Sequence, residues 1–321
     1  MTRRTLLAAP LFAAKPIRVA MVGTGHGHAL SKQKALASMA EYDFAGASAE
    51  PSEAYLRDPS IELIAVEFAG ATENLAFAQR AIDAGKFVHL DKPPGADLAG
   101  LRKLLAAAAR KRLVVQMGYQ WRYHPAMEAV LTAARQGWLG EVHRFRASIE
   151  KPILAEEREH LARYKGGMMF SEGCHLIDRA TALLGKPAKV KGFIRHHGQP
   201  DDRLADNNLV ILEYPRAIAE ISLAGFDPHG SAHRYVEILG TNGSMRAQPF
   251  APVRLHVQLK SAAGPYQAGE QWLEPPSPPG LTYTPDFAEM AAVIRQGKKP
   301  TYSAEHDLMT QEVLLTACGM L

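Results

Sequence analysis

Three polar side chains lie on one predicted helix with a spacing that suits proton transfer. Ser171, His175 and Asp178 occur at i, i+4 and i+7 in a largely apolar segment that we predict to be helical over about 172–184. At about 100° per residue, this spacing places them within roughly a 60° arc of the helix surface. Glu172 flanks His175 on the other side. Imidazole suits general acid–base catalysis near neutral pH and a carboxylate can orient it, so His175 is a candidate catalytic residue. A buried, hydrogen-bonded histidine beside a helix-capping serine is the structural alternative.

A second candidate is a lysine held between an acid and two prolines. The segment HLDKPPG closes an apolar run that we predict to be a parallel strand over 86–90. Ligands bind at the carboxyl ends of such strands, where Lys92 stands. Pro93 removes a backbone donor and disfavours helical geometry at Lys92. We therefore predict that the prolines direct the Lys92 ammonium into a ligand site. A solvated loop charge is the alternative.

Glycines follow the first predicted strand, residues 17–23. The segment GTGHGH puts Gly23 and Gly25 at the first two positions of the dinucleotide fingerprint G-x-G-x-x-G, and His28 at the third. The first glycine makes the turn and the second lets a pyrophosphate approach the backbone. The helix that follows offers free N–H groups and its dipole to a phosphate. We predict a dinucleotide site formed by Gly23, Gly25 and His26, with an ordinary strand–helix turn as the alternative.

An acidic residue closes the second predicted strand, residues 44–50. In dinucleotide-binding folds, a carboxylate at this point accepts hydrogen bonds from the ribose hydroxyls of NAD and repels the extra phosphate of NADP. Glu50 occupies that place in the sequence. We therefore predict NAD as the cofactor, in preference to NADP. The alternative is a solvated loop carboxylate.

The hydrophobic pattern predicts that these residues are carried by two different kinds of sheet. In the first part, strands alternate with helices, which indicates a doubly wound parallel sheet covered on both faces, a Rossmann domain over 16–122. The predicted strands are 17–23, 44–50, 61–68, 86–90 and 112–119, and the helices are 28–40, 72–84 and 97–111.

The character of the sequence changes near residue 140. Alternating stretches follow one another without helices between them, and GTNGS at 240–244 is typical of a tight turn between two strands. We predict a second, α+β domain over 123–321 with a mostly antiparallel open sheet, whose last helices can pack back on the first domain. Its predicted strands are 188–197, 207–214, 216–226, 233–240 and 252–259, and its final helices are 285–296 and 304–318.

Composition excludes several classes of protein. Of 321 residues, 47% are hydrophobic and 22% are charged, which predicts a packed core and not a disordered chain. The net charge of +4 comes without a basic block interleaved with aromatic residues, so we predict no nucleic-acid binding. No stretch is long and apolar enough to span a bilayer. Cys174 and Cys318 form no disulfide framework. We also predict no metal site, because the paired histidines lack ligand spacing: His26/His28 and His196/His197.

The N-terminus, MTRRTLLAAPLFAAKP, resembles a short twin-arginine export signal. Arg3 and Arg4 precede an apolar run over 6–14, although no small residue stands at the position that a good cleavage site needs. We expect residues 1–15 to be either this signal or a disordered cytoplasmic N-terminus, and we favour a periplasmic location. Export would require the protein to carry its cofactor with it.

Taken together, these segments resemble the Gfo/Idh/MocA family, named for glucose–fructose oxidoreductase, inositol dehydrogenase and a rhizopine-catabolism protein. The resemblance covers nearly all of residues 16–318. AIDAGKFVHLDKPPG is similar to the family's "aGkhVlvEKP" segment, and VVQMGYQWRYHPAM is similar to its "R-f-h-P" segment. GGMMFSEGCHLIDRATALLGKP is similar to its glycine–histidine–aspartate segment. Three further segments also match: IRVAMVGTGHGHAL, GTNGSM and DFAEMAAVIRQGKKP.

The resemblance implies an NAD(P)-dependent oxidoreductase that acts on a hydroxyl or carbonyl of a sugar or cyclic polyol. It implies that His175 is the general base, that Lys92 stabilises the developing charge on the substrate oxygen beside the cofactor, and that Asp178 orients His175 or binds a substrate hydroxyl. It also implies a homodimer or homotetramer formed through the second domain's sheet. The candidate substrate contacts are Arg122, Ser171 and Glu172.

Three departures from the family pattern keep other functions open. The family's aspartate four residues before the histidine is Ser171 here, the third fingerprint position is His28, and the loop usually of Thr-Pro-Asn type reads AGA at 69–71. One alternative is a glycoside-cleaving enzyme in which a retained NAD oxidises the sugar transiently. Another is a catalytically impaired cofactor-binding or sensory protein.

Overall fold

The computed structural model describes residues 15–25, 27–197, 202–248, 253–275 and 283–321. Two of the expectations above, the twin-arginine signal and the cofactor contact of His26, lie outside the described residues.

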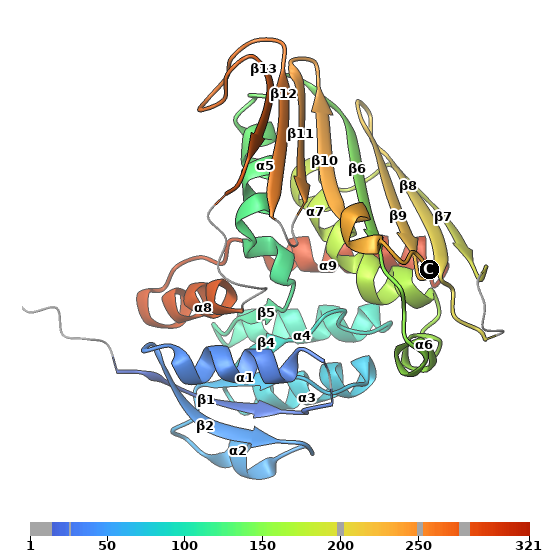
Figure 1. Cartoon of the computed structure of the whole chain (residues 1–321). Helices are drawn as coiled ribbons and strands as arrows, with labels where there is room; N and C mark the ends of the chain where they lie inside the picture. Colours follow the sequence, from blue (N-terminus) through green and yellow to red (C-terminus); the bar gives the residue numbers. More distant parts are fainter. Residues whose placement is uncertain (1–14, 26, 198–201, 249–252, 276–282) are drawn as a thin grey trace, which may run out of the picture.

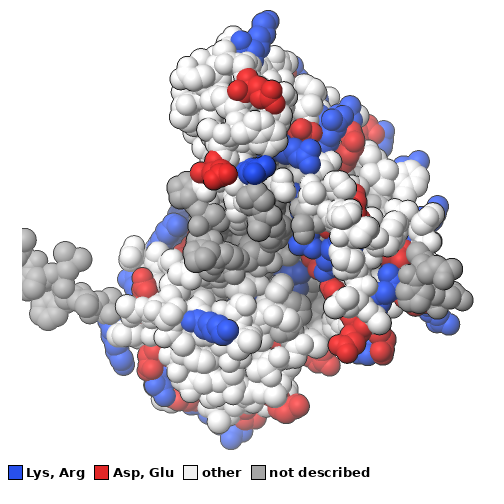
Figure 2. Space-filling view, viewed as in Figure 1, with Lys and Arg blue, Asp and Glu red and all other residues white. Residues whose placement is uncertain are grey.

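Across the described part of the chain, no helix has both the length and the hydropathy to cross a bilayer. Basic and acidic side chains are interspersed on the face shown in Figure 2.

The first sheet is parallel and doubly wound, as predicted. Its five strands lie in the order β2-β1-β3-β4-β5. They are β1 (Ile17–Val22), β2 (Tyr42–Ser48), β3 (Leu63–Val66), β4 (Phe87–Leu90) and β5 (Val115–Met117). The helices between them are α1 (Ala29–Ser38), α2 (Glu53–Arg57), α3 (Ala71–Asp83) and α4 (Leu98–Arg110). The strand β2 ends two residues before Glu50, so the predicted end of this strand is wrong.

The two faces of this sheet are covered from different parts of the chain. Helices α3 and α4 pack on one face. Helix α1 covers part of the other face, and α8 (Thr284–Gln296), from the far end of the chain, lies beside it (Figure 1). Phe287 and Met290 of α8 are fully buried with Ile17 and Leu36. Tyr42 Oη donates a hydrogen bond to the Phe287 carbonyl oxygen at 2.7 Å.

The second sheet has eight strands and is mostly antiparallel, as predicted. Their order is β13-β12-β11-β10-β6-β9-β8-β7, and among the described strands of this sheet only β6 and β9 pair in parallel. The strands are β6 (Val142–Glu150), β7 (Lys189–Arg195), β8 (Asn207–Glu213), β9 (Ile218–Ala224), β10 (Tyr235–Gly240), β11 (Gly243–Gln248), β12 (Arg254–Leu259) and β13 (Gly269–Leu273).

Helices cover one face of this second sheet (Figure 1). They are α5 (Pro125–Arg135), α7 (Cys174–Leu184) and α9 (Ala304–Ala317), while α6 (Ala155–Leu161) lies beyond the end of β6. Apolar side chains of β6, β9 and β10 face these helices and are buried. The opposite face carries ion pairs such as Arg144 with Glu220 and Arg146 with Glu237. A continuous core runs from α3 and α4 through α5, α7 and α9 to the second sheet, so the two halves pack closely.

The strand β6 was not predicted, although its sequence alternates. Phe145, Ala147 and Ile149 are buried, and the charged Arg144 and Arg146 between them lie on the open face. The two arginines occupy the outward positions of this alternation, so the strand pattern is present in the sequence but was not recognised. This strand matters because its last residues lead directly into the candidate site.

Candidate active site

Lys92 lies just beyond the carboxyl end of β4 and connects the two halves of the molecule. Its peptide bond to Pro93 is cis, and the residue is only 5% exposed. Its Nζ donates a hydrogen bond to the backbone carbonyl oxygen of Ser171, 2.9 Å away. An ammonium group has three N–H donors, so two remain for other acceptors. The structure therefore places Lys92 at the junction of the two sheets and not in solvent.

The segment that receives this hydrogen bond is a π-helical turn, Met169–Gly173, which continues directly into α7. Ser171 lies within this helical segment, so its side chain does not cap the helix as the structural alternative supposed. Its carbonyl oxygen accepts from Lys92 and also from the Cys174 thiol, at 3.1 Å. A π-helical turn pairs residues five apart, not four, and such turns occur frequently at functional sites.

His175 is at the start of α7 and is 2% exposed. Its ring stacks on Trp121, with ring centroids 5.6 Å apart, and meets the edge of Tyr119. Its Nδ1 has no hydrogen-bond partner among the described residues. Burial lowers the pKa of His175 well below its usual range, and the nearby Lys92 lowers it further. The imidazole is therefore neutral near pH 7 and able to accept a proton.

Glu172 precedes this histidine by three residues and interacts with it electrostatically. The partner of Glu172 is a residue that the sequence did not single out. The Nζ of Lys151, just after β6, lies 3.0 Å from Glu172 Oε1 and also pairs with Glu157. Burial raises the pKa of Glu172, but Lys92 and Lys151 outweigh it, and the net pKa is lowered. Glu172 is thus an ionised counter-charge to two lysines. Lys151 could have been found only if β6 had been recognised.

Asp178 does not have the surroundings that were expected. Its fully buried carboxylate accepts from Arg122 Nη2 at 2.7 Å, from Arg179 Nη2 at 2.5 Å and from His306 Nε2 at 3.0 Å. No hydrogen bond joins it to His175 among the described residues. The expectation that Asp178 orients His175 or binds a substrate hydroxyl is therefore replaced by a role in a buried ion network.

Arg122 belongs to the same network and is 1% exposed. Its guanidinium donates to Asp178 and, at 2.5 Å, to Asp307 of α9, and lies over the ring of Tyr302. Its guanidinium is already paired with two buried carboxylates, and the predicted contact of Arg122 with a substrate stays a prediction. The network ties the segment after β5 to α7 and α9, and so fixes the helix that carries His175.

The turn after β1 contains two glycines that the residues around them crowd. Gly23 has φ +77°, and a Cβ there would lie 2.3 Å from the backbone N of Phe68, so only glycine fits. A Cβ on Gly25 would come within 3.3 Å of Ala69 Cβ. Helix α1 then begins at Ala29, and its N-cap residue, His28, makes no capping hydrogen bond with its side chain; the first turn contains no acid. Its uncapped N–H groups fit a pyrophosphate, which would satisfy them.

A buried charge cluster that the sequence did not reveal lies beside this turn. Lys32 of α1 is fully buried, and its Nζ is 2.6 Å from both Glu67 and Asp91, which follow β3 and β4. His28 Nδ1 lies 3.3 Å from Asp91 Oδ1. Burial and the neighbouring Asp91 raise the pKa of Glu67 to about 8. The cluster joins α1 to the ends of β3 and β4. One of its members, Asp91, immediately precedes Lys92 in the chain.

Glu50 is exposed, just after β2. This position leaves its carboxylate accessible to a ribose. Its contact with a cofactor stays a prediction.

The chain is similar in sequence to a known domain family and to known oxidoreductases. Residues 127–246 match the family model of the GFO/IDH/MocA C-terminal domain. Human trans-1,2-dihydrobenzene-1,2-diol dehydrogenase is 29% identical over 167 residues, which cover 51% of this chain and 48% of that protein. The dTDP-3,4-didehydro-2,6-dideoxy-alpha-D-glucose 3-reductase of Streptomyces violaceoruber is 28% identical over 189 residues, 59% of this chain and 53% of that protein. The chain thus matches about half the length of these relatives.

Solved structures share the fold over almost the whole chain. An oxidoreductase from Agrobacterium radiobacter, in complex with NAD+, L-tartaric acid and magnesium, has a TM-score of 0.81 at 14% identity, covering 95% of this chain and 96% of that one. A 3-ketoreductase from Actinomadura kijaniata, in complex with TDP-benzene and NADP, has a TM-score of 0.76 at 19% identity, covering 94% and 96%. At these identities the likeness shows the fold alone.

Proposed function

Since the chain belongs to the Gfo/Idh/MocA family, we propose that it is a nicotinamide-dependent oxidoreductase acting on a CH–OH or C=O group. The observation that carries this proposal is the meeting of Lys92, from the end of β4, with the helical segment that bears a neutral, buried His175. One group can hydrogen-bond an oxygen and the other can take its proton. That pairing is what oxidation of an alcohol demands from a protein.

The cofactor is proposed to lie across the turn formed by Gly23 and Gly25, with its pyrophosphate at the N-terminus of α1. When bound, the nicotinamide supplies the hydride acceptor or donor. The exposed carboxylate of Glu50 supports NAD over NADP, because it would repel a phosphate on the ribose. The glycine turn and the uncapped helix start support this placement.

The protein's own residues then handle the proton and the charge. His175 accepts the hydroxyl proton, since its imidazole is neutral at pH 7. Lys92 keeps one N–H on the Ser171 carbonyl oxygen and offers another to the substrate oxygen as negative charge develops there. Glu172 balances the charge of Lys92 and Lys151 beside the histidine.

The proposed substrate is a sugar or cyclic polyol. Two relatives, a 1,2-diol dehydrogenase and a 3-reductase of a dTDP-linked dideoxy sugar, support a substrate with oxygen on adjacent ring carbons. The site supports the same class, because two lysines and a carboxylate near His175 offer several hydrogen-bonding groups.

We also propose a homodimer or homotetramer formed through the open face of the second sheet. Large apolar side chains stay exposed there: Phe193 and Leu209, each 38% exposed, and Trp272, 60% exposed. Phe193 and Leu209 are cross-strand partners, so they form a joint patch. Light scattering measures the mass of the unmodified chain and of Leu209→Glu in solution. The proposal is overturned if the two masses are equal.

Purified protein tests the catalytic proposal. NAD+ binding is expected to be detectable by calorimetric titration. In an assay with a panel of sugars and cyclic polyols, at least one compound is expected to give net formation of NADH. Release of an aglycone without net NADH would support glycoside cleavage instead. Binding of NAD+ with no turnover on either panel, and no effect of Lys92→Ala, would support a sensory protein. Absence of NAD+ and NADP+ binding would overturn the proposal.

A further inference from the structure

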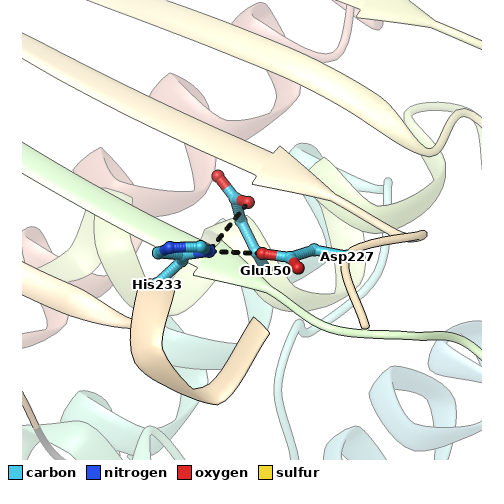
Figure 3. Close-up of side chains that lie close together, drawn as sticks. All are labelled: Glu150, Asp227 and His233. Atoms are coloured by element: carbon cyan, nitrogen blue, oxygen red, sulfur yellow. Dashed lines mark hydrogen bonds and ion pairs between the residues drawn. The ribbon is translucent and has the colours of Figure 1, made fainter. Parts of the chain in front are cut away.

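Three potential metal ligands converge outside the candidate active site, from three separate elements. Glu150 is the last residue of β6, Asp227 follows β9, and His233 ends the 3₁₀ turn η3 (Gly230–His233). One ligand atom from each lies within 4.8 Å of the others. Figure 3 shows the three side chains pointing toward one another. His233 Nδ1 is 3.8 Å from Glu150 Oε2 and is hydrogen-bonded to Asp227 Oδ2.

The fold brings these residues together by close backbone packing. β6 and β9 run parallel, with Glu150 paired with Ala224, so both strands deliver their following segments to the same place. At the start of η3, a Cβ on Gly230 would lie 2.2 Å from the Glu150 carbonyl oxygen. Glycine is therefore required for the turn to dock on the end of β6 and bring His233 over Glu150.

In each carboxylate, one oxygen accepts a hydrogen bond from a neighbouring protein group, and the other oxygen faces His233. Asp227 Oδ1 accepts from the backbone N–H of His229 at 2.8 Å, which leaves Oδ2 directed at His233. Glu150 Oε1 accepts from Ser148 Oγ at 3.2 Å, and Oε2 is the atom nearer His233. Ser148 in turn accepts from Ser222 Oγ at 3.1 Å. Hydrogen bonds that orient the ligating carboxylates in this way are characteristic of metal sites.

The charges of the cluster also favour a cation. The side chains of Glu150, Asp227 and His233 are 28%, 16% and 54% exposed, so the two acids lie close together in a partly desolvated position. Two carboxylates so placed repel each other unless a proton or a cation lies between them. His233, the most exposed of the three, leaves the site open to solvent and to water as further ligands.

We propose that Glu150, Asp227 and His233 bind a divalent transition-metal ion of the Zn²⁺ type. One imidazole nitrogen and two carboxylate oxygens suit such an ion, with ligand bonds of about 2.0–2.2 Å and water completing the coordination. The bound ion would clamp η3 and the segment after β9 to the end of β6. The next residue, Lys151, extends to Glu172 at the candidate active site. This inference is independent of the proposed redox function.

Zinc binding by the full, untagged chain tests this site. After treatment with EDTA and dialysis, equilibrium dialysis with Zn²⁺ and elemental analysis are expected to give one zinc per chain. His233→Ala and Asp227→Asn are expected to weaken binding at least about tenfold. His256→Ala is the matched control, because His256 and Glu270 form a His–carboxylate pair at 2.7 Å with no third ligand in the described residues.

Two outcomes would overturn the assignment. One is an unmodified chain that binds no more zinc than His233→Ala, which would leave only an ordinary ion pair at this position. The other is an equal loss of zinc in His256→Ala. Thermal melting with and without Zn²⁺ guards against misfolding: each variant must be folded, and only chains with all three ligands should be stabilised by the metal.

Discussion

The ammonium nitrogen of Lys92 lies 2.9 Å from the carbonyl oxygen of Ser171, and this hydrogen bond links the end of a parallel strand to the helix that carries His175. The pair is 79 residues apart in sequence. A residue at a strand end of the first sheet thus contacts a helical segment of the second domain at the candidate site. The relative position of Lys92 and His175 depends on how the two halves pack.

Replacing Lys92 by methionine is expected to lower kcat by about 10²–10³, because a donor to the developing oxyanion is lost. NAD+ affinity should change much less. Lys86→Met is the matched control, since Lys86 is equally 5% exposed but donates to the carbonyl oxygens of Asp58 and Ile61, away from the site. Steady-state kinetics and NAD+ titration of both variants check this, and equal losses of kcat would contradict the assigned role.

The pH profile of alcohol oxidation should reflect the lowered pKa of His175. A free histidine would lose its capacity as a base below about pH 6.5. Because burial and Lys92 lower the pKa of His175 well below that value, kcat/KM should show no acid limb at 6.5 due to this residue. His175→Asn should reduce kcat across the whole range. A limb at 6.5 that disappears in His175→Asn would contradict the buried, neutral imidazole.

Acid should destabilise the protein through a second buried histidine. Burial, with Lys32 nearby, lowers the pKa of His89 from 6.5 to about 3. The unfolded chain then binds more protons than the folded one below pH 6.5, so stability is greatest above 6.5 and falls as the pH decreases toward 3. His89→Leu should lose less stability between pH 7.5 and 5 in urea unfolding than the unmodified chain. The exposed His143→Leu serves as the control.

Asp178→Asn is expected to act mainly on stability. The substitution leaves Arg122 and Arg179 buried with one charge fewer to balance them, which costs about 3–5 kcal/mol. Asp307→Asn, which removes the other carboxylate on Arg122, should have a similar effect. Chemical unfolding of both variants measures this. A fully stable but inactive Asp178→Asn would instead restore the direct catalytic role that the sequence suggested.

Glu50→Ala should shift cofactor preference toward NADP by about tenfold, equivalent to about 1.4 kcal/mol. The reason is that a carboxylate facing the ribose repels the extra phosphate. Glu53→Ala is a nearby control, because Glu53 pairs with Arg80 at the start of α2. Dissociation constants for NAD+ and NADP+ decide the matter, and no change in their ratio would place Glu50 outside the cofactor site.

Sequence reasoning placed Lys92, His175 and the glycine turn because each depends on local pattern: a strand end, a helix face and a backbone that admits only glycine. It failed for Asp178, because the partners of that carboxylate come from three other segments and leave no mark on the spacing within the helix. It failed for Lys151 because the alternating strand before it, with its two arginines facing outward, was not recognised. The π-helical turn Met169–Gly173 also could not be predicted from the sequence, because one extra residue in a helical turn barely changes the spacing of the apolar residues.

The packing of α8 on the first sheet has a consequence for synthesis of the chain. Phe287 and Met290 cover a face whose own strands end by residue 117. During translation, the five strands of the first sheet are therefore synthesised long before α8, the helix that covers this face. Until α8 is made, the nascent first domain exposes an apolar surface that can aggregate. A chaperone that covers this surface would reduce aggregation at this stage, and a delay in translation would prolong the exposure.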